Sequence, residues 1–177
     1  GVSAVDAVWF THIHADHVHG IDDLRVFTAR RGDVDAYIAS EYREKIARYF
    51  EYIFDEAVQA APGSSIPSVK LHELEEGRPV GIVGESFTPL LVPHGPTNVY
   101  GFRVGKLGYI TDGKRLPPTT LEALKGGDVL VLNALWFGRP HPSHFNIEEA
   151  IEAAREVGAE RTYLTHLTHR VTHAELE

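Results

Sequence analysis

The sequence contains no cysteine. Disulfides and thiolate ligands are therefore excluded, and any metal ion would have to be held by histidine, aspartate or glutamate. No apolar run approaches the ~20 residues that are needed to cross a bilayer, and the first residues lack the pattern of a signal peptide. We therefore predict a cytoplasmic protein that has no membrane partner.

Basic residues are also scarce, because 17 Lys and Arg oppose 25 Asp and Glu and the formal net charge is −8. A protein that binds an extended nucleic acid needs clustered basic side chains, so the excess of acidic residues argues against such binding. A small anionic substrate is still compatible, because bound metal ions reverse the local potential. A length of 177 residues favours one domain with a substantial core.

The most informative segment is Thr11–His17, which places three histidines and one aspartate within six residues. It directly follows the apolar run Val5–Phe10, which predicts a buried strand. Alternation along the chain can aim His12 and His14 at one point, while Asp16 and His17 turn toward a neighbouring point. Imidazole and carboxylate together suit zinc, manganese or iron. We therefore predict a metal site here and not merely a histidine-rich loop.

The rest of the chain mixes helix and strand patterns, which indicates an α/β (α+β) fold with sheets covered by helices. Helices are predicted over 22–30, 40–53, 117–124 and 147–157, and a further helix is predicted to begin near 172. Strands are predicted over 35–39, 87–92, 98–104, 107–111, 128–135 and 161–165. The segment 59–68 is the least ordered by composition.

Three later positions share one property, which is that a titratable side chain directly follows a buried run. His94 comes after Leu90–Val92, Asp112 after Leu107–Thr111, and His166 after Tyr163–Thr165. In α/β proteins, catalytic and ligand-binding residues usually lie at the ends of the strands. These residues are therefore candidates to complete a metal site.

The motifs resemble those of the metallo-β-lactamase fold superfamily, whose signature is His-x-His-x-Asp-His followed by a later His, Asp and His. The matching stretches are Thr11–Gly20, Val92–Gly95, Tyr109–Asp112, Pro142–Asn146 and Leu164–His166. The last two point to the phosphodiesterase branch that includes the cyclic-phosphate hydrolase of phosphonate breakdown. The resemblance implies an αββα sandwich that lacks its N-terminal strands and its last C-terminal strand. It thus implies a single hydrolase domain over 1–177, incomplete at both ends, with a helical insertion at about 40–68.

The resemblance also implies a site with two divalent ions, zinc in the first place and manganese or iron as alternatives. Its ligands would be His12, His14 and His94 for one ion, Asp16, His17 and His166 for the other, and Asp112 between them. A hydroxide bridging the ions would attack a small or cyclic phosphodiester. Asp16, Asp112 and His144 would be the catalytic residues.

His144 is set apart from the ligands, because in this branch the corresponding histidine faces the substrate phosphate. It would stabilise charge on a phosphoryl oxygen or protonate the leaving alkoxide. It also precedes a helix start at Asn146, where backbone N–H groups favour an anion. The chain departs from relatives at Gly113, where a hydroxyl residue is common, and Lys114 is a candidate contact for an anionic substrate.

Two other functions are compatible with the same motifs. One is an endonuclease of the type that processes the 3′ end of tRNA, which would need a basic arm. The segment Phe50–Ser68 contains acidic residues and neither Lys nor Arg, which argues against that arm. The other is a metal-binding remnant without turnover. Hydrolysis of a β-lactam or thioester is disfavoured by Asp112 and His144, and a homodimer is compatible with the sequence.

Overall fold

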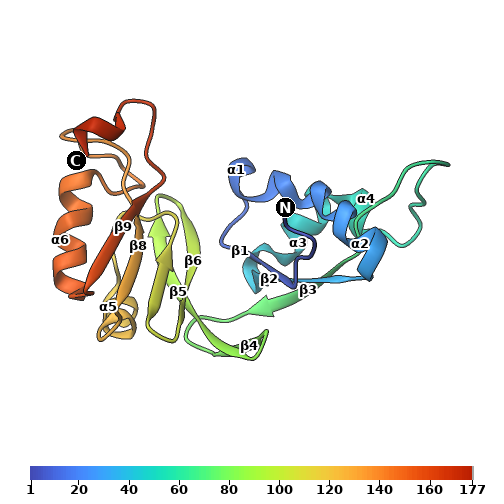
Figure 1. The fold of residues 1–177 in the computed structure, drawn as a ribbon, viewed down its shortest axis with the longest axis horizontal. Coiled ribbons are helices and arrows are strands. Elements are labelled where there is room, and N and C mark those ends of the chain that lie inside the picture. The colour runs from blue at the N-terminus through green and yellow to red at the C-terminus, as the bar shows by residue number, and fades with distance from the viewer. Residues whose placement is uncertain (177) are drawn as a thin grey trace. The chain divides into compact units, whose positions relative to one another are not determined.

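The structure is a computed structural model, and it describes residues 1–176. Its contacts separate the chain into two compact units, Gly1–Glu75 and the remainder from Glu76 onward. Each unit contains its own sheet (Figure 1). The single domain predicted over 1–177 stays a prediction. Within residues 1–176, none of the helices is both long enough and apolar enough to span a membrane.

The first unit is built on a parallel sheet in the order β1 (Ala7–Phe10), β2 (Val34–Ala39) and β3 (Val69–Leu74). The connection from β1 to β2 contains α1 (Ala15–Val18), the 3-10 helix η1 (His19–Leu24) and α2 (Arg25–Arg31). The predicted helix over 22–30 therefore begins as a 3-10 turn. The buried apolar side chains of this unit include those of Phe10, Val18, Ile21, Ile38, Ile46 and Leu74.

The region predicted as a helical insertion at about 40–68 is helical only in its first part. It contains α3 (Ser40–Tyr49) and α4 (Glu51–Phe54), which are separated by Phe50 with φ −122° and ψ 46°. Tyr42 and Ile46 are buried, whereas Tyr49 is 58% exposed, so the apolar stripe does not continue through the break. Residues 55–68 contain neither helix nor strand, which agrees with the two prolines and the glycine in this segment.

The second unit is built on a six-stranded mixed sheet in chain order. Its strands are β4 (Val80–Ile82), β5 (Glu85–His94), β6 (Thr97–Val104), β7 (Leu107–Ile110), β8 (Val129–Asn133) and β9 (Arg161–Thr165). The pairs from β4 to β7 are antiparallel, and β7–β8 and β8–β9 are parallel. Strands β5, β7, β8 and β9 therefore all run in one direction and end at the same edge of the sheet.

Two helices, α5 (Pro118–Leu124) and α6 (Ile147–Val157), pack on this sheet, and the 3-10 helix η2 (His173–Glu175) follows β9 (Figure 1). Their apolar sides meet the sheet in one core, which contains Leu90, Ile110, Leu124, Leu130, Leu132, Phe145, Ile147 and Ala150. Burial of such side chains contributes about 1.5–3 kcal/mol each. The sheets and covering helices confirm the predicted α/β class.

Candidate metal centre

The second unit brings four predicted site residues to the carboxyl edge of its sheet. His94 is the last residue of β5, Asp112 lies two residues beyond β7, and His166 directly follows β9. His144 precedes α6 in the connection that leaves β8. The common direction of these strands brings residues that are far apart in the sequence, such as Asp112 and His166, to the same edge of the sheet.

The carboxylate of Asp112 is at the centre of this group and is only 1% exposed. Its Oδ1 lies 3.0 Å from Nε2 of His144 and 3.0 Å from Nε2 of His166. The ring of His94 lies 4.4 Å from that of His144. His94 Nδ1 donates to the carbonyl oxygen of Ser143 at 2.9 Å, so Nε2 is the nitrogen that carries the acceptor lone pair of the neutral ring.

His166 adopts a left-handed backbone conformation, with φ 61°. Histidine is one of the residues that tolerate this region, but it still costs of order 1–3 kcal/mol when the surroundings enforce it. The turn ends β9 abruptly and allows the imidazole to face Asp112. A strained residue at this point is typical of a functional site.

Gly113, next to Asp112, has a structural reason for being glycine. Its φ is 155°, and a Cβ added there would lie 2.2 Å from Cγ1 of Val92. The hydroxyl residue that is common in relatives would therefore not fit without movement of β5. The backbone of this loop is fixed on both sides, because Lys114 N donates to Pro93 O and Phe145 N donates to Gly113 O.

We expect Gly113→Ala to lower the free energy of unfolding by about 3 kcal/mol, because it combines left-handed backbone strain with overpacking against Val92. Gly84→Ala is the matched control, since Gly84 has φ 83° but nothing within 4 Å of its Cβ position. That variant should lose only about 1 kcal/mol. Urea denaturation measures both values, and equal losses would contradict the packing argument.

The first unit holds the other predicted ligands together on α1 and in the short loop between β1 and α1. His12 is buried, and its Nε2 lies 2.9 Å from Nδ1 of His14. The rings of His12 and His17 are 4.3 Å apart, and Nε2 of His17 lies 3.2 Å from Oδ2 of Asp16. His17 N also donates to His14 O at 3.0 Å, so the single turn of α1 folds Asp16 and His17 back beside the two preceding histidines.

His141 belongs to the same neighbourhood as His144, although its sequence context gave no sign of it. Its Nδ1 lies 3.2 Å from Nδ1 of His144, and Ser143 Oγ lies 3.2 Å from both nitrogens. Burial, together with the charges of His144 and Lys114, lowers the pKa of His141. His141 therefore contacts His144 on the side away from Asp112.

The start of α6 is capped by residues of its own first turn. Asn146 and Glu149 form a capping box, in which Asn146 Oδ1 accepts from Glu149 N at 2.8 Å and Glu149 Oε2 accepts from Asn146 N at 3.0 Å. Ile147 N donates to Trp136 O. The carboxylate of Glu149 therefore already lies at the helix end where the sequence favours an anion.

The donor chemistry of both groups fits a borderline divalent ion. Imidazole nitrogens and carboxylate oxygens bind zinc at about 2.0–2.2 Å, so tetrahedral ligand atoms lie roughly 3.3 Å apart. Nε2 of His12 lies 2.9 Å from Nδ1 of His14. Oδ1 of Asp112 lies 3.0 Å from Nε2 of His144 and 3.0 Å from Nε2 of His166. These distances are close to the spacing of zinc ligands. Ligand atoms of His94, Asp112 and His144 all lie within 4.8 Å of one another. The second unit alone therefore carries a buried His/Asp cluster typical of a metal site.

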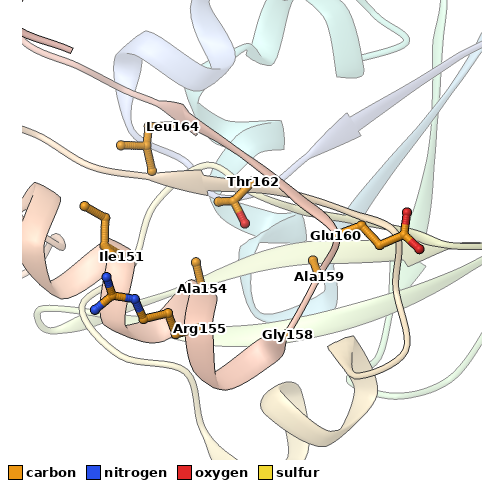
Figure 2. A pocket seen from close by; sticks show the side chains of 8 residues that line it. All are labelled: Ile151, Ala154, Arg155, Gly158, Ala159, Glu160, Thr162 and Leu164. Atoms are coloured by element: carbon orange, nitrogen blue, oxygen red, sulfur yellow. The ribbon is translucent and has the colours of Figure 1, made fainter. Parts of the chain in front are cut away.

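A groove of about 420 Å³ in the second unit lies elsewhere, between α6 and β9. Figure 2 shows Ile151, Ala154 and Arg155 on the helix facing Thr162 and Leu164 on the strand. Its lining contains no histidine and one acidic residue, Glu160. It lacks the donors of a transition-metal site, so its size does not make it the candidate centre.

Comparisons with known proteins agree with this chemistry. Residues 1–167 match the family described as "Beta-lactamase superfamily domain". A diphosphatase from the PhnP family has a crystal structure that is 31% identical, with a TM-score of 0.86, over 99% of this chain and 65% of that one. The metallo-β-lactamase fold protein YhfI from Bacillus subtilis is 21% identical, with a TM-score of 0.77, over 97% of this chain and 68% of that one.

A curated relative is the octanoyltransferase of Porphyromonas gingivalis, which is 32% identical over 169 residues. The match covers 96% of this chain but only 33% of that protein. The chain thus spans about a third of the curated relative and about two thirds of the diphosphatase. The predicted resemblance, including the branch, is confirmed, and the likeness to YhfI supports the fold alone.

Proposed function

The chain belongs to the β-lactamase superfamily, and we propose that it is a metal-dependent hydrolase that cleaves small or cyclic phosphodiesters. The observation that carries the proposal is the buried carboxylate of Asp112 between the imidazoles of His144 and His166. The similarity to a PhnP-family diphosphatase supports phosphorus as the reacting centre.

We assign two ions to the predicted ligands: His12, His14 and His94 to one, Asp16, His17 and His166 to the other, and Asp112 to both. The motif spacing in the sequence and the donor chemistry within each unit support this assignment. Two bound divalent ions would neutralise phosphoryl oxygens and lower the pKa of water toward ~7. Zinc suits the nitrogen-rich donor set best.

His144 then acts on the substrate through Nε2, the nitrogen that faces Asp112. Its side chain is 13% exposed, and its other nitrogen is held by Ser143 and His141. A protonated Nε2 can donate to a phosphoryl oxygen or transfer its proton to the leaving oxygen, which contributes typically 10²–10⁴-fold in rate. Ser143 and His141 orient that ring from its Nδ1 side.

The charge distribution favours a small substrate over RNA. Lys114, a sequence candidate for substrate contact, has its ammonium group within 2.6 Å of the Glu149 carboxylate. A net charge of −8 offers little electrostatic attraction to a polyanion. Acyl transfer is not assigned either, because the octanoyltransferase name belongs to a protein of which the match covers 33%.

The direct test measures metal content and hydrolysis on the same preparations. Purified protein supplemented with zinc, manganese or iron should contain close to two ions per chain and hydrolyse a bis-aryl phosphate ester. A panel of cyclic and linear phosphodiesters then identifies the preferred substrate class. Absence of bound metal after supplementation, or bound metal without hydrolysis of any ester in the panel, would refute the proposal.

We expect His144→Ala to lower kcat about 100-fold while both ions stay bound, because the variant loses a proton donor but no assigned ligand. His72→Ala is the control. The imidazole of His72 is 44% exposed and pairs with Asp35, and both residues belong to the first unit. Stopped-flow or steady-state assays and elemental analysis give the two readouts. Loss of an ion from His144→Ala would show that this residue is a ligand.

A further inference from the structure

A pair of charged residues joins the two segments that present Asp112 and His144. The ammonium group of Lys114 lies 2.6 Å from each carboxylate oxygen of Glu149, and the two side chains are 28% and 30% exposed. The pair Lys106–Asp128, in the same unit, is 67% and 43% exposed. Screening by water is therefore weaker at Lys114–Glu149 than at a typical surface pair.

Glu149 is held rigidly on its helix before it meets Lys114. Its carboxylate accepts from Asn146 N and its own N–H donates to Asn146 Oδ1, while Asn146 Nδ2 donates to Gly138 O at 2.6 Å. Although burial opposes ionisation, the hydrogen bonds from Lys114 and Asn146 lower the pKa of Glu149. The charged group thus has one fixed position at the first turn of α6.

Lys114 is fixed at its backbone in the same way. Its N–H donates to Pro93 O, next to His94, and the neighbouring Gly113 O accepts from Phe145 N, next to His144. Lys114 lies two residues after Asp112, and Glu149 lies five residues after His144. The ion pair therefore spans the junction at which His144 Nε2 meets Asp112 Oδ1.

We infer that Lys114 and Glu149 are positioning residues, whose ion pair holds the loop after β7 against the start of α6 and so sets the contact between His144 and Asp112. This inference rests on the proposed function of His144. The pair is not needed to form α6, because the capping box and the Phe145–Gly113 hydrogen bond remain without it. Its loss should loosen His144 and leave the fold in place.

The kinetic test replaces Lys114 by methionine, which keeps the length of the side chain and removes the charge. We expect Lys114→Met to lower kcat for a bis-aryl phosphate ester about tenfold, with KM and metal content within about twofold, because small displacements of a catalytic group are costly. Lys114→Arg should restore most of the loss. Lys106→Met is the matched control and should leave kcat unchanged.

A double-mutant cycle separates positioning from a general loss of stability. In a His144→Ala background, Lys114→Met should cause no further fall in kcat, since the group that it positions is absent. Glu149→Gln keeps an oxygen for Asn146 N but removes the partner of Lys114, and should behave like Lys114→Met. Independent, multiplicative effects of Lys114→Met and His144→Ala, or loss of metal from either charge variant, would overturn the inference.

A second readout does not depend on hydrolysis. In the metal-free protein labelled with ¹⁵N-histidine, the imidazole signals of His144 are identified by their absence from His144→Ala. They should shift in Lys114→Met and Glu149→Gln and stay unchanged in Lys106→Met. If the wild-type protein fails to hydrolyse phosphodiesters, this shift still tests the positioning role, and unchanged His144 signals in both charge variants would overturn it.

Discussion

Asp112→Asn is expected to lower hydrolysis of a bis-aryl phosphate ester by about 10³-fold or more and to reduce metal content. The carboxylate is the anionic group among the His94, His144 and His166 imidazoles of the second unit, and it is 1% exposed. Asparagine keeps its size but carries no charge and presents an NH2 group that cannot bind a cation. Metal catalysis of phosphoryl transfer supplies several kcal/mol, which makes a loss of this size reasonable.

The same substitution should not damage the metal-free fold. A buried carboxylate carries a desolvation cost, and replacing Asp112 by asparagine removes that cost together with the charge. We expect metal-free Asp112→Asn to unfold at or above the temperature of the metal-free wild type, as measured by differential scanning calorimetry. Asp128→Asn, which removes an exposed carboxylate, is the control and should keep both metal and turnover. Full activity in Asp112→Asn would remove the basis of the proposed site.

Local sequence signals were enough to predict the elements that end at the site. The capping pattern of Asn146 and Glu149 and the glycine at 158 delimit α6 (Ile147–Val157), and the apolar run 161–165 is β9. These signals depend on neighbouring residues, so the sequence alone determines them. The predicted strands over 98–104 and 107–111 are found for the same reason, as the antiparallel pair β6 and β7.

The predicted strand over 87–92 ends too early, because a proline such as Pro93 usually interrupts a strand. In the structure β5 continues through Pro93 to His94 and pairs with β6 along that length. The carbonyl of Pro93 accepts from Lys114 N, so the nitrogen of Pro93 faces away from β6 and its missing N–H costs no ladder bond. The sequence could not reveal this, because it depends on which side of the strand faces a distant loop.

His141 and Lys114 show which residues near the site cannot be predicted from the sequence. Neither residue belongs to the stretches that match the superfamily signature, so the sequence does not place either of them beside His144 or Asp112. Their positions depend on the connection from β8 to α6, which hydrogen bonds from Phe145 N to Gly113 O and from Ile147 N to Trp136 O hold in place. The ion pair of Lys114 joins residues 35 positions apart. Contacts of this kind are set by tertiary packing and leave no periodic trace in the sequence.

Removal of bound metal should abolish hydrolysis and destabilise the protein. A ligand present at about 1,000 times its Kd stabilises the folded state by about 4 kcal/mol, which corresponds to a fall in Tm of roughly 8–16 °C when the ions are removed from a chain of this size. Dialysis against a chelator followed by scanning calorimetry measures this shift, and the addition of zinc should restore both Tm and turnover.

The Asp112→Asn variant makes this experiment specific to the proposed centre. If the ions bind at Asp112, chelation should lower the Tm of Asp112→Asn by much less than that of the wild type, whereas Asp128→Asn should show the full shift. Both variants lose one carboxylate and differ in burial, since the side chain of Asp128 is 43% exposed. An equal change in Tm on chelation in all three proteins would mean that the stabilising metal binds elsewhere. The buried His/Asp cluster would then not be the metal centre.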